Sequence, residues 1–412
     1  MKKYLFAYLL PALLLLGFMS VSLVACGDDE EDEESFVEDE VVKVDSKGKA
    51  KGDHTFVKID DNNFYIDDFK YTVVNNGELE LSGYNDYAIL RGKKSIIKAL
   101  EYDGRRMEVT SIGQRALAHC DEIRGLFIPS SVTRIGNGAF SECNALATIN
   151  IPEGVTAIGD ETFKRCQNLA SINIPNKVTS IGKEAFSYCP LLTSINLPNG
   201  VTFIGEAAFQ DCVCLKSMII PNGVTSIGAK TFSGCVALTS ISLPSSITSI
   251  GESAFWDCES LTTITIPDNV TTIALMAFSC CKGLTSVNIG KNVTTIGQAA
   301  FSDCSSLTTI TIPNSVTTIG IGSFSGCSSV TSITIGSAVT TIDEGAFSSC
   351  PNLKDVYSYA KKVPAARDAF HNYSENDPNL SKATLHVLAA SIEAYKAQYP
   401  WSEFGSIVVI NE

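Results

Sequence analysis

Histidine is scarce in this sequence, which has only His54, His119, His371 and His386 among its 412 residues. General acid–base catalysis uses a histidine, or converging carboxylates, held in a pocket that shifts the pKa. The sequence also lacks a G-x-S-x-G elbow with His and Asp partners, and no glycine-rich phosphate loop opens a helix. We therefore predict no enzymatic activity and no cofactor.

Positive charge is sparse as well. Lysine and arginine total 31 against 45 acidic residues, a formal net charge of −14, and no basic stripe with interleaved aromatic residues occurs. A protein that binds nucleic acid must neutralise phosphates with Lys and Arg, so we exclude nucleic acid as a partner. Zinc sites need spaced pairs such as C-x-x-C converging with histidine, which this chain does not offer. We predict no metal site.

The longest apolar stretch lies at the N-terminus, in MKKYLFAYLLPALLLLGFMSVSLVAC. Lys2 and Lys3 begin it and small residues precede Cys26, which indicates a signal peptide over residues 1–25. Leu23 to Cys26 resembles the bacterial lipobox, which implies that Cys26 is lipidated and becomes the mature N-terminus. The alternative is a membrane-spanning helix with an incidental cysteine, but the apolar run is short and its flanks are those of a signal.

Residues 26–52 follow, and in them the stretch GDDEEDEESFVEDE comes directly after Cys26. A block of like charge cannot collapse, so we predict a disordered acidic tether. The tether can serve as a spacer. It also resembles the export signal by which some Gram-negative anaerobes place lipoproteins on the outer face of the outer membrane, and the two roles are compatible. The implied location is the cell surface, with the lipid as the membrane contact.

A 23-residue period dominates residues 109–358, where LTTITIPDNVTTIALMAFSCCKG (261–283) and LTTITIPNSVTTIGIGSFSGCSS (307–329) repeat one pattern. An aliphatic residue lies three positions after a regular cysteine, and isoleucine or a similar residue lies six and eight positions after it. This alternation predicts a half-buried strand. The regular cysteines are Cys120, Cys143, Cys166, Cys189, Cys212, Cys235, Cys258, Cys281, Cys304, Cys327 and Cys350.

Each repeat continues with proline, a second apolar segment Val-Thr-x-Ile-Gly, and Ala-Phe before the next cysteine. Proline ends the strand because it lacks an N–H donor, and the glycine predicts either a positive φ or a crowded corner. One repeat cannot bury its own apolar face, so repeats must stack, and each buried aliphatic or Phe side chain contributes about 1.5–3 kcal/mol. Stacking at about 4.8 Å per coil predicts a body about 50 Å long.

The pattern LxxIxIPxxVTxIGxxAFxxC resembles the BspA-type leucine-rich repeat of bacterial surface proteins, from about Val109 to Tyr357, and residues 383–410 resemble that family's closing segment. The resemblance implies a β-rich repeat solenoid, a right-handed leucine-rich-repeat stack of about 10–11 coils. It also implies surface attachment and binding of a protein or matrix partner. Single corners depart from the pattern, at Gly290, Gly336, Ala274, Asp343 and Leu117.

Both ends of such a stack need a cover. Residues 53–108 lack the period and read as strands, with a hairpin signal at Asp103-Gly104, so we predict an N-terminal β cap. Residues 359–412 are predicted to form a small α+β C-terminal cap, in which Ser391 caps a short helix that runs through Tyr399 and Trp401 closes the apolar column.

The eleven regular cysteines share one slot, so their side chains point the same way, which suits a disulfide poorly. We predict a ladder of buried, reduced thiols that act as small apolar fillers. A chain of disulfides is the alternative for an exported protein. Cys214 and Cys280 lie outside the ladder. We interpret both as incidental loop residues; the alternatives are an exposed thiol at Cys214 and a vicinal disulfide between Cys280 and Cys281.

Short polar side chains stand between the inward isoleucines, and a second file of threonines runs from Thr133 to Thr340. Threonine suits the outer face of a strand and pairs with neighbouring hydroxyls, which is a sufficient structural explanation. Alternatively, this uncharged surface docks a protein or glycan where larger residues interrupt it, because exposed aromatic residues are frequent hot spots. The candidate binding residues are Phe127, Ile219, Tyr357, Trp256 and Tyr188.

Together these patterns favour a monomeric, non-catalytic cell-surface lipoprotein that adheres to a host matrix protein or a neighbouring cell. Two alternatives are a structural spacer and a glycan-capture module for nutrient uptake, which would use Trp256 and Tyr188 as stacking platforms. The aromatic residues are scattered along the sequence rather than grouped on one face, and this favours a protein partner over a glycan.

Overall fold

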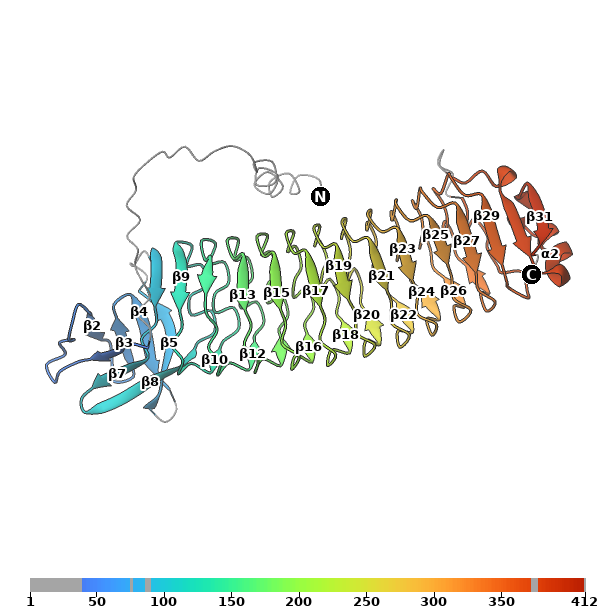
Figure 1. The fold of residues 1–412 in the computed structure, drawn as a ribbon. Helices are drawn as coiled ribbons and strands as arrows, with labels where there is room; N and C mark the ends of the chain where they lie inside the picture. The colour runs from blue at the N-terminus through green and yellow to red at the C-terminus, as the bar shows by residue number, and fades with distance from the viewer. Residues whose placement is uncertain (1–38, 75–76, 86–89, 372–376, 411–412) are drawn as a thin grey trace, which may run out of the picture.

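The computed structural model describes residues 39–74, 77–85, 90–371 and 377–410. These residues form an elongated stack with one cap at each end (Figure 1). The predicted signal peptide and Cys26 lie outside the described residues. Within the described part of the chain, no helix is both long enough and apolar enough to cross a membrane.

Each coil contributes two short strands, and equivalent residues of adjacent coils pair in parallel one repeat apart, as in Ser171 with Ser194. The first strands are β9 (Ile123–Phe127), β11 (Thr148–Ile149), β13 (Ser171–Asn173), β15 (Ser194–Asn196), β17 (Ser217–Ile219), β19 (Ser240–Ser242), β21 (Thr263–Thr265), β23 (Ser286–Asn288), β25 (Thr309–Thr311), β27 (Ser332–Ile335) and β29 (Asp355–Ser358). The second strands are β10 (Arg134–Ile135), β12 (Ala157–Ile158), β14 (Ser180–Ile181), β16 (Phe203–Ile204), β18 (Ser226–Ile227), β20 (Ser249–Ile250), β22 (Thr272–Ile273), β24 (Thr295–Ile296), β26 (Thr318–Ile319) and β28 (Thr341–Ile342). The predicted repeat solenoid is confirmed.

The solenoid has about 13 turns, more than the 10–11 predicted from the cysteines. After β29 the same parallel sheet continues with β30 (Thr384–Val387) and β31 (Ser406–Val409). At the other end, β6 (Gly92–Ser95) pairs with β9. These added strands keep neither the 23-residue spacing nor the cysteine, so counting cysteines misses the coils to which they belong.

A column of phenylalanine rings runs through the core. From Phe140 to Phe370, successive ring centroids lie 5.0–5.7 Å apart and the ring planes differ by at most 27°. The column ends against Trp401 and Phe404, whose rings each meet Phe370 edge-on at 5.6 Å. Rings at identical positions stack only if the coils are in register, so the column opposes slippage of one coil against the next.

The cysteine ladder lies beside this column, and all eleven thiols are buried and free. From Cys143 onward, each Sγ donates a hydrogen bond to the carbonyl of the Phe-position residue of the preceding coil, at 3.0–3.5 Å. Burial raises the pKa of Cys166 to about 12 and raises the pKa of Cys189 as well. The thiols are therefore neutral donors that link coils, as well as small apolar fillers.

A third ladder of hydrogen bonds, which the sequence patterns do not predict, crosses the segment between the glycine and the cysteine. The N–H groups of Glu184, Phe186 and Tyr188 donate to the next coil's carbonyls at 2.7–2.9 Å. The residues five and one before each ladder cysteine have positive φ in every coil, as in Glu184 (φ 53°) and Tyr188 (φ 58°). The left-handed region costs a non-glycine residue about 1–2 kcal/mol, which the inter-coil bonds offset.

The glycine that closes eight of the ten second strands is explained by crowding rather than by a positive φ. A Cβ added to Gly182 would lie 2.5 Å from the backbone nitrogen of Asp160, and one added to Gly205 would lie 2.5 Å from that of Lys183. Both contacts are with the preceding coil. Glycine at this corner therefore lets successive backbones approach closely.

The N-terminal cap contains β1 (Val41–Lys43), β2 (Phe56–Lys58), β3 (Asn63–Ile66), β4 (Phe69–Val73), β5 (Leu79–Tyr84), β7 (Ala99–Tyr102) and β8 (Arg105–Ile112). They form one sheet, in the order β1-β7-β8-β5-β4-β3-β2, and β10 of the first coil pairs with β8. The predicted hairpin is present, because Tyr102 pairs with Arg105 and both Asp103 (φ 50°) and Gly104 (φ 68°) are left-handed. The cap sheet is thus hydrogen-bonded to the first coil of the solenoid through β8 and β10.

The predicted tether of residues 26–52 is too long at its C-terminal end. Within it, β1 pairs in parallel with β7, and Val42 and Val44 are buried. The Asp39 carboxylate also accepts hydrogen bonds from the N–H and hydroxyl of Ser130, in the first coil. The short apolar segment at Val41–Val44 supplies side chains that a purely acidic block lacks, so the chain joins the fold before residue 52.

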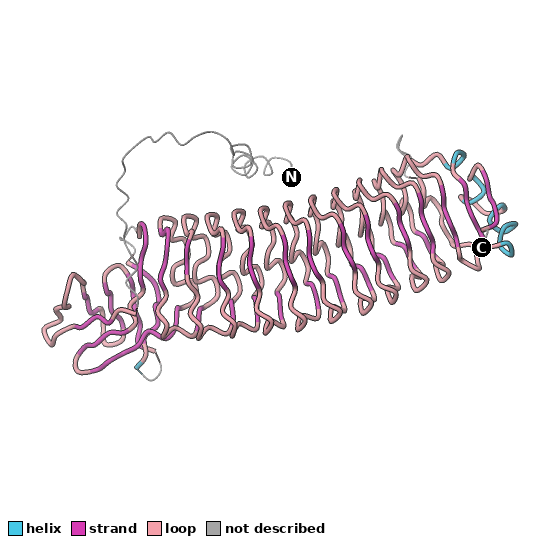
Figure 2. The backbone as a smooth tube through the Cα atoms, in the orientation of Figure 1, coloured by secondary structure: helices cyan, strands magenta, loops and turns pink. Residues whose placement is uncertain are grey.

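The C-terminal cap holds the helical segments η2 (Leu380–Lys382), η3 (Ala389–Ser391), α2 (Ile392–Lys396) and η4 (Trp401–Glu403), which gather at that end of the molecule (Figure 2). The predicted helix from Ser391 through Tyr399 is wrong in length and in its cap. The Ser391 hydroxyl donates to the carbonyl of Lys361 at 3.2 Å instead of capping the helix. Trp401 is fully buried and closes the core.

A first prediction concerns the phenylalanine column. We expect Phe232→Ala, in the middle of the column, to lower the free energy of unfolding by about 3–5 kcal/mol, because it removes two ring contacts and leaves a cavity. Phe203→Ala is the matched control, since that side chain is 55% exposed on β16 and should cost less than about 1 kcal/mol. Urea unfolding followed by circular dichroism measures both. Equal losses in the two variants would contradict a register-holding core column.

A second prediction concerns the thiols. In the folded protein at neutral pH, we expect iodoacetamide to modify Cys214 and Cys280, which are half-buried, at least about a hundredfold faster than the ladder cysteines. The reason is that burial raises the pKa of the ladder thiols and excludes the reagent. Peptide mass spectrometry before and after urea denaturation gives the rates. Similar labelling rates for Cys235 and Cys214 in the folded state would contradict the burial of the ladder thiols.

Candidate binding face

The outward side chains of the first strands form a long surface, which we call the strand face. It comprises the residues five and seven positions after each ladder cysteine from Cys143 to Cys327, and the apolar residues between them point inward. These residues carry no charge. They are Thr148, Asn150, Ser171, Asn173, Ser194, Asn196, Ser217, Ile219, Ser240, Ser242, Thr263, Thr265, Ser286, Asn288, Thr309, Thr311, Ser332 and Thr334.

Ile219 is the apolar interruption of the strand face. It pairs with Ser242 across β17 and β19, and it occupies the position that Asn196 fills one repeat earlier. Its side chain is 77% exposed, whereas Met218 beside it is buried. An exposed aliphatic side chain on a rigid polar surface releases water when a partner covers it, so this position is where the face can gain binding energy.

The second file of threonines proves to be part of the scaffold. The hydroxyls of Thr179, Thr202 and Thr340 each donate to the backbone carbonyl of the equivalent threonine one coil earlier, at 3.2–3.4 Å. The pairing predicted between neighbouring hydroxyls is therefore replaced by pairing with the backbone. Because these hydroxyls are committed within the protein, the file offers a partner fewer free groups than its sequence suggests.

Larger residues bound the strand face at both ends. Phe127 of β9 is half-buried and pairs with Ser95 of β6. Tyr357 of β29 stacks on His386 of β30, with ring centroids 4.2 Å apart and planes 11° apart. The patterns in the sequence did not identify His386, because it lies beyond the 23-residue period; the signal was the alternation in Thr384–Val387, which places it outward.

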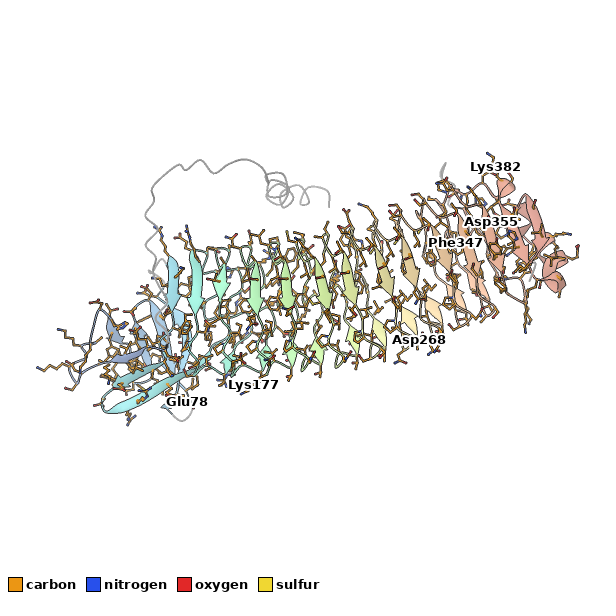
Figure 3. All side chains as sticks on the ribbon, viewed as in Figure 1. Glu78, Lys177, Asp268, Phe347, Asp355 and Lys382 are labelled. Atoms are coloured by element: carbon orange, nitrogen blue, oxygen red, sulfur yellow. The ribbon has the colours of Figure 1, made fainter. Side chains whose placement is uncertain are left out.

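Asp355 fixes the orientation of His386. Its Oδ1 atom lies 2.9 Å from Nε2 of the imidazole, so the carboxylate accepts a hydrogen bond from that ring nitrogen. Asp355 pairs with Ser332 and Thr384 in neighbouring strands, so it stands next to the stacked rings. Figure 3 labels it at the C-terminal end of the molecule. The structure thus brings one predicted residue, Tyr357, together with two that were not predicted.

Tyr188 and Trp256 do not belong to the strand face. They lie one and two positions before the ladder cysteine, in the segment that carries the third hydrogen-bond ladder, and are 37% and 38% exposed. The Arg165 guanidinium lies 5.4 Å from the Tyr188 ring centroid. Burial raises the pKa of Asp211, while hydrogen bonds from Tyr188 and Gln210 oppose that rise. Tyr188 is therefore engaged in a local polar cluster.

Among the described residues, no group of three or more His, Cys, Asp and Glu side chains is arranged to hold a metal ion. The face offers hydroxyls, amides, one exposed isoleucine and an aromatic end, which can bind a partner by contact and hydrogen bonding.

Several solved structures are similar to this chain. A leucine-rich repeat protein from Bacteroides ovatus ATCC 8483 has 26% identity and a TM-score of 0.43, covering 79% of this chain and 99% of its own. A leucine rich cell surface protein from Faecalibacterium prausnitzii A2-165 has 24% identity and a TM-score of 0.49, covering 85% and 95%. The pneumococcal vaccine antigen PcpA has 14% identity and a TM-score of 0.50, covering 87% and 99%, and shares the fold.

No curated protein matches the sequence. The family described as the BspA type leucine rich repeat region matches residues 110–239 and 225–354, in six copies. The matched ranges cover more than half of the chain and coincide with the coils of the solenoid, including the strand face. This chain therefore belongs to the BspA-type leucine-rich repeat family.

Proposed function

We propose that this protein is a cell-surface lipoprotein that binds a protein partner through its strand face, without catalysis, and so adheres to a host matrix protein or a neighbouring cell. The observation that carries the proposal is the exposed Ile219 at the middle of a long, rigid and uncharged surface. A leucine-rich repeat solenoid of this kind typically serves as a protein-interaction scaffold.

The chemistry of the face indicates how a partner would be held. Ser, Thr and Asn side chains exchange water for a partner's backbone and polar groups at modest cost, because no charge must be desolvated. Ile219 supplies the apolar contact around which such polar contacts exclude water. Since the face carries no charge, binding should depend little on salt concentration.

Attachment to the cell surface is supported by the sequence motifs at the N-terminus. Lipid on Cys26 would hold the chain to the membrane, and the acidic residues after it would keep the chain extended, because like charges repel. In this arrangement a monomer presents its solenoid beyond the membrane surface, with the strand face open along its length.

A third prediction tests the role of Ile219. We expect the chain from residue 35 to 412 to bind at least one protein on an array of matrix proteins, and Ile219→Asp to weaken that binding by at least about tenfold. The loss has a physical reason, because the substitution puts a charge where the partner buries an apolar side chain. Surface plasmon resonance at low and high salt measures the affinity.

The matched control is Ile321→Asp, which changes an isoleucine that is 50% exposed in a turn segment rather than on the strand face. It should leave binding unchanged. Equal weakening by both variants, or binding that disappears at high salt, would count against the proposal. Binding to saccharides alone would favour glycan capture, and no binding to either array would favour a spacer.

A further inference from the structure

Three aromatic residues lie on neighbouring strand segments at the C-terminal end of the strand face, although His386 is 29 positions from Tyr357 in the sequence. Tyr357 and Tyr359 alternate with the buried residues Val356 and Ser358, so both point outward from the same strand segment. His386 joins them from β30, where it pairs with Tyr357. The sequence separates His386 from the two tyrosines, whereas the structure places it on the strand next to Tyr357.

The rings occupy only one side of Tyr357. His386 covers one ring face at 4.2 Å, while on the opposite side the strand neighbour of Tyr357 is Thr334. The backbone N–H of Tyr359 donates to the carbonyl of Ile335, which places Gly336 beside Tyr359. Neither Thr334 nor Gly336 has a side chain as long as a ring. The surface over Thr334 and Gly336 is therefore flanked on one side by Tyr357 and Tyr359.

The dimensions of that space suit one flat ring. Adjacent strands lie about 4.8 Å apart, close to the separation of stacked rings, so a flat ligand above Thr334 would continue the stack of His386 and Tyr357. Beside Tyr357 on the neighbouring strand are Thr334 and, two residues before it, Ser332, which pairs with Asp355. Asp355 uses Oδ1 for His386, and its Oδ2 is a second oxygen that can accept hydrogen bonds.

We propose that this place is a saccharide-binding site, in which the apolar C–H face of a sugar ring stacks on Tyr357 and the sugar hydroxyls bond to Asp355 and to the Ser332 and Thr334 hydroxyls. Apart from the Tyr357 ring, the residues around this place, Ser332, Thr334 and Asp355, carry groups that form hydrogen bonds. The charge of Asp355 is partly balanced by its hydrogen bond from His386, so the environment suits an uncharged, hydroxyl-rich ligand.

The site is distinct from the proposed protein-binding position. Six repeats separate Ile219 from Tyr357, which corresponds to about 29 Å at the strand spacing. Substitution at one position therefore leaves the other intact. The saccharide site does not rest on the proposed protein partner, and failure of either leaves the other standing.

The fourth prediction tests this site with the full chain and a panel of neutral oligosaccharides derived from starch, cellulose, laminarin and mannan. We expect at least one to bind by isothermal titration calorimetry, and Tyr357→Ala to weaken that binding by at least about tenfold. Tyr357→Phe keeps the stacking ring and should bind within about threefold of the unchanged protein. Thr334→Trp should abolish binding, because the indole fills the space intended for the sugar.

Tyr188→Ala is the control, since it removes an exposed tyrosine outside the site, and Ile219→Asp is a second. Both should leave saccharide binding unchanged. Circular dichroism and urea unfolding verify that each variant is folded, and the Thr334→Trp result stands even if Tyr357→Ala unfolds. The inference is overturned if no oligosaccharide in the panel binds, or if binding persists in both Tyr357→Ala and Thr334→Trp.

Discussion

The structure depends on one constraint, which is that each coil is hydrogen-bonded to the next in a register that is the same from coil to coil. Partners in the two strand ladders lie 23 positions apart in the sequence, the ladder through the left-handed turn residues joins residues 22 positions apart, and the thiol-to-carbonyl bonds join residues 26 positions apart. A slip of one residue would break all of these ladders together and would turn inward-facing isoleucines to the solvent. The phenylalanine column strengthens the same register, because its rings stack only when equivalent positions coincide.

This constraint also decides which residues the surface can carry. Every outward side chain has a copy of its own position about 4.8 Å above and below it, so a charged residue repeated in every coil would repel itself. Serine, threonine and asparagine have no such cost, and the strand face consists largely of them. Distinctive chemistry arises where the repetition is interrupted, at Ile219 in the middle and around Tyr357 and His386 at the end. The solenoid therefore supplies a neutral background against which the proposed binding positions stand out.

The sequence predicted the solenoid, the strands and the core because these follow from a short pattern that recurs with one period. The shared position of the cysteines and the Asp103-Gly104 hairpin were equally predictable, since each follows from a local sequence pattern. The grouping of Tyr357 with His386 was not predictable, because it depends on how the C-terminal cap continues the sheet outside the period. The left-handed residues were also missed, because Glu184 and Tyr188 carry side chains that do not signal a positive φ. Their conformation is imposed by bonds to the next coil.

The glycine corners and the phenylalanine column have a consequence for how this protein can change over generations. Each coil presents the same upper and lower surface, so removal or duplication of one whole repeat would join surfaces that already fit. Recombination between the similar DNA segments that encode the repeats would thus lengthen or shorten the rod in steps of about 4.8 Å, and neither cap would need to change. The distance between Ile219 and the aromatic end would shift by the same steps, so the spacing of the two proposed ligand positions is an evolvable length.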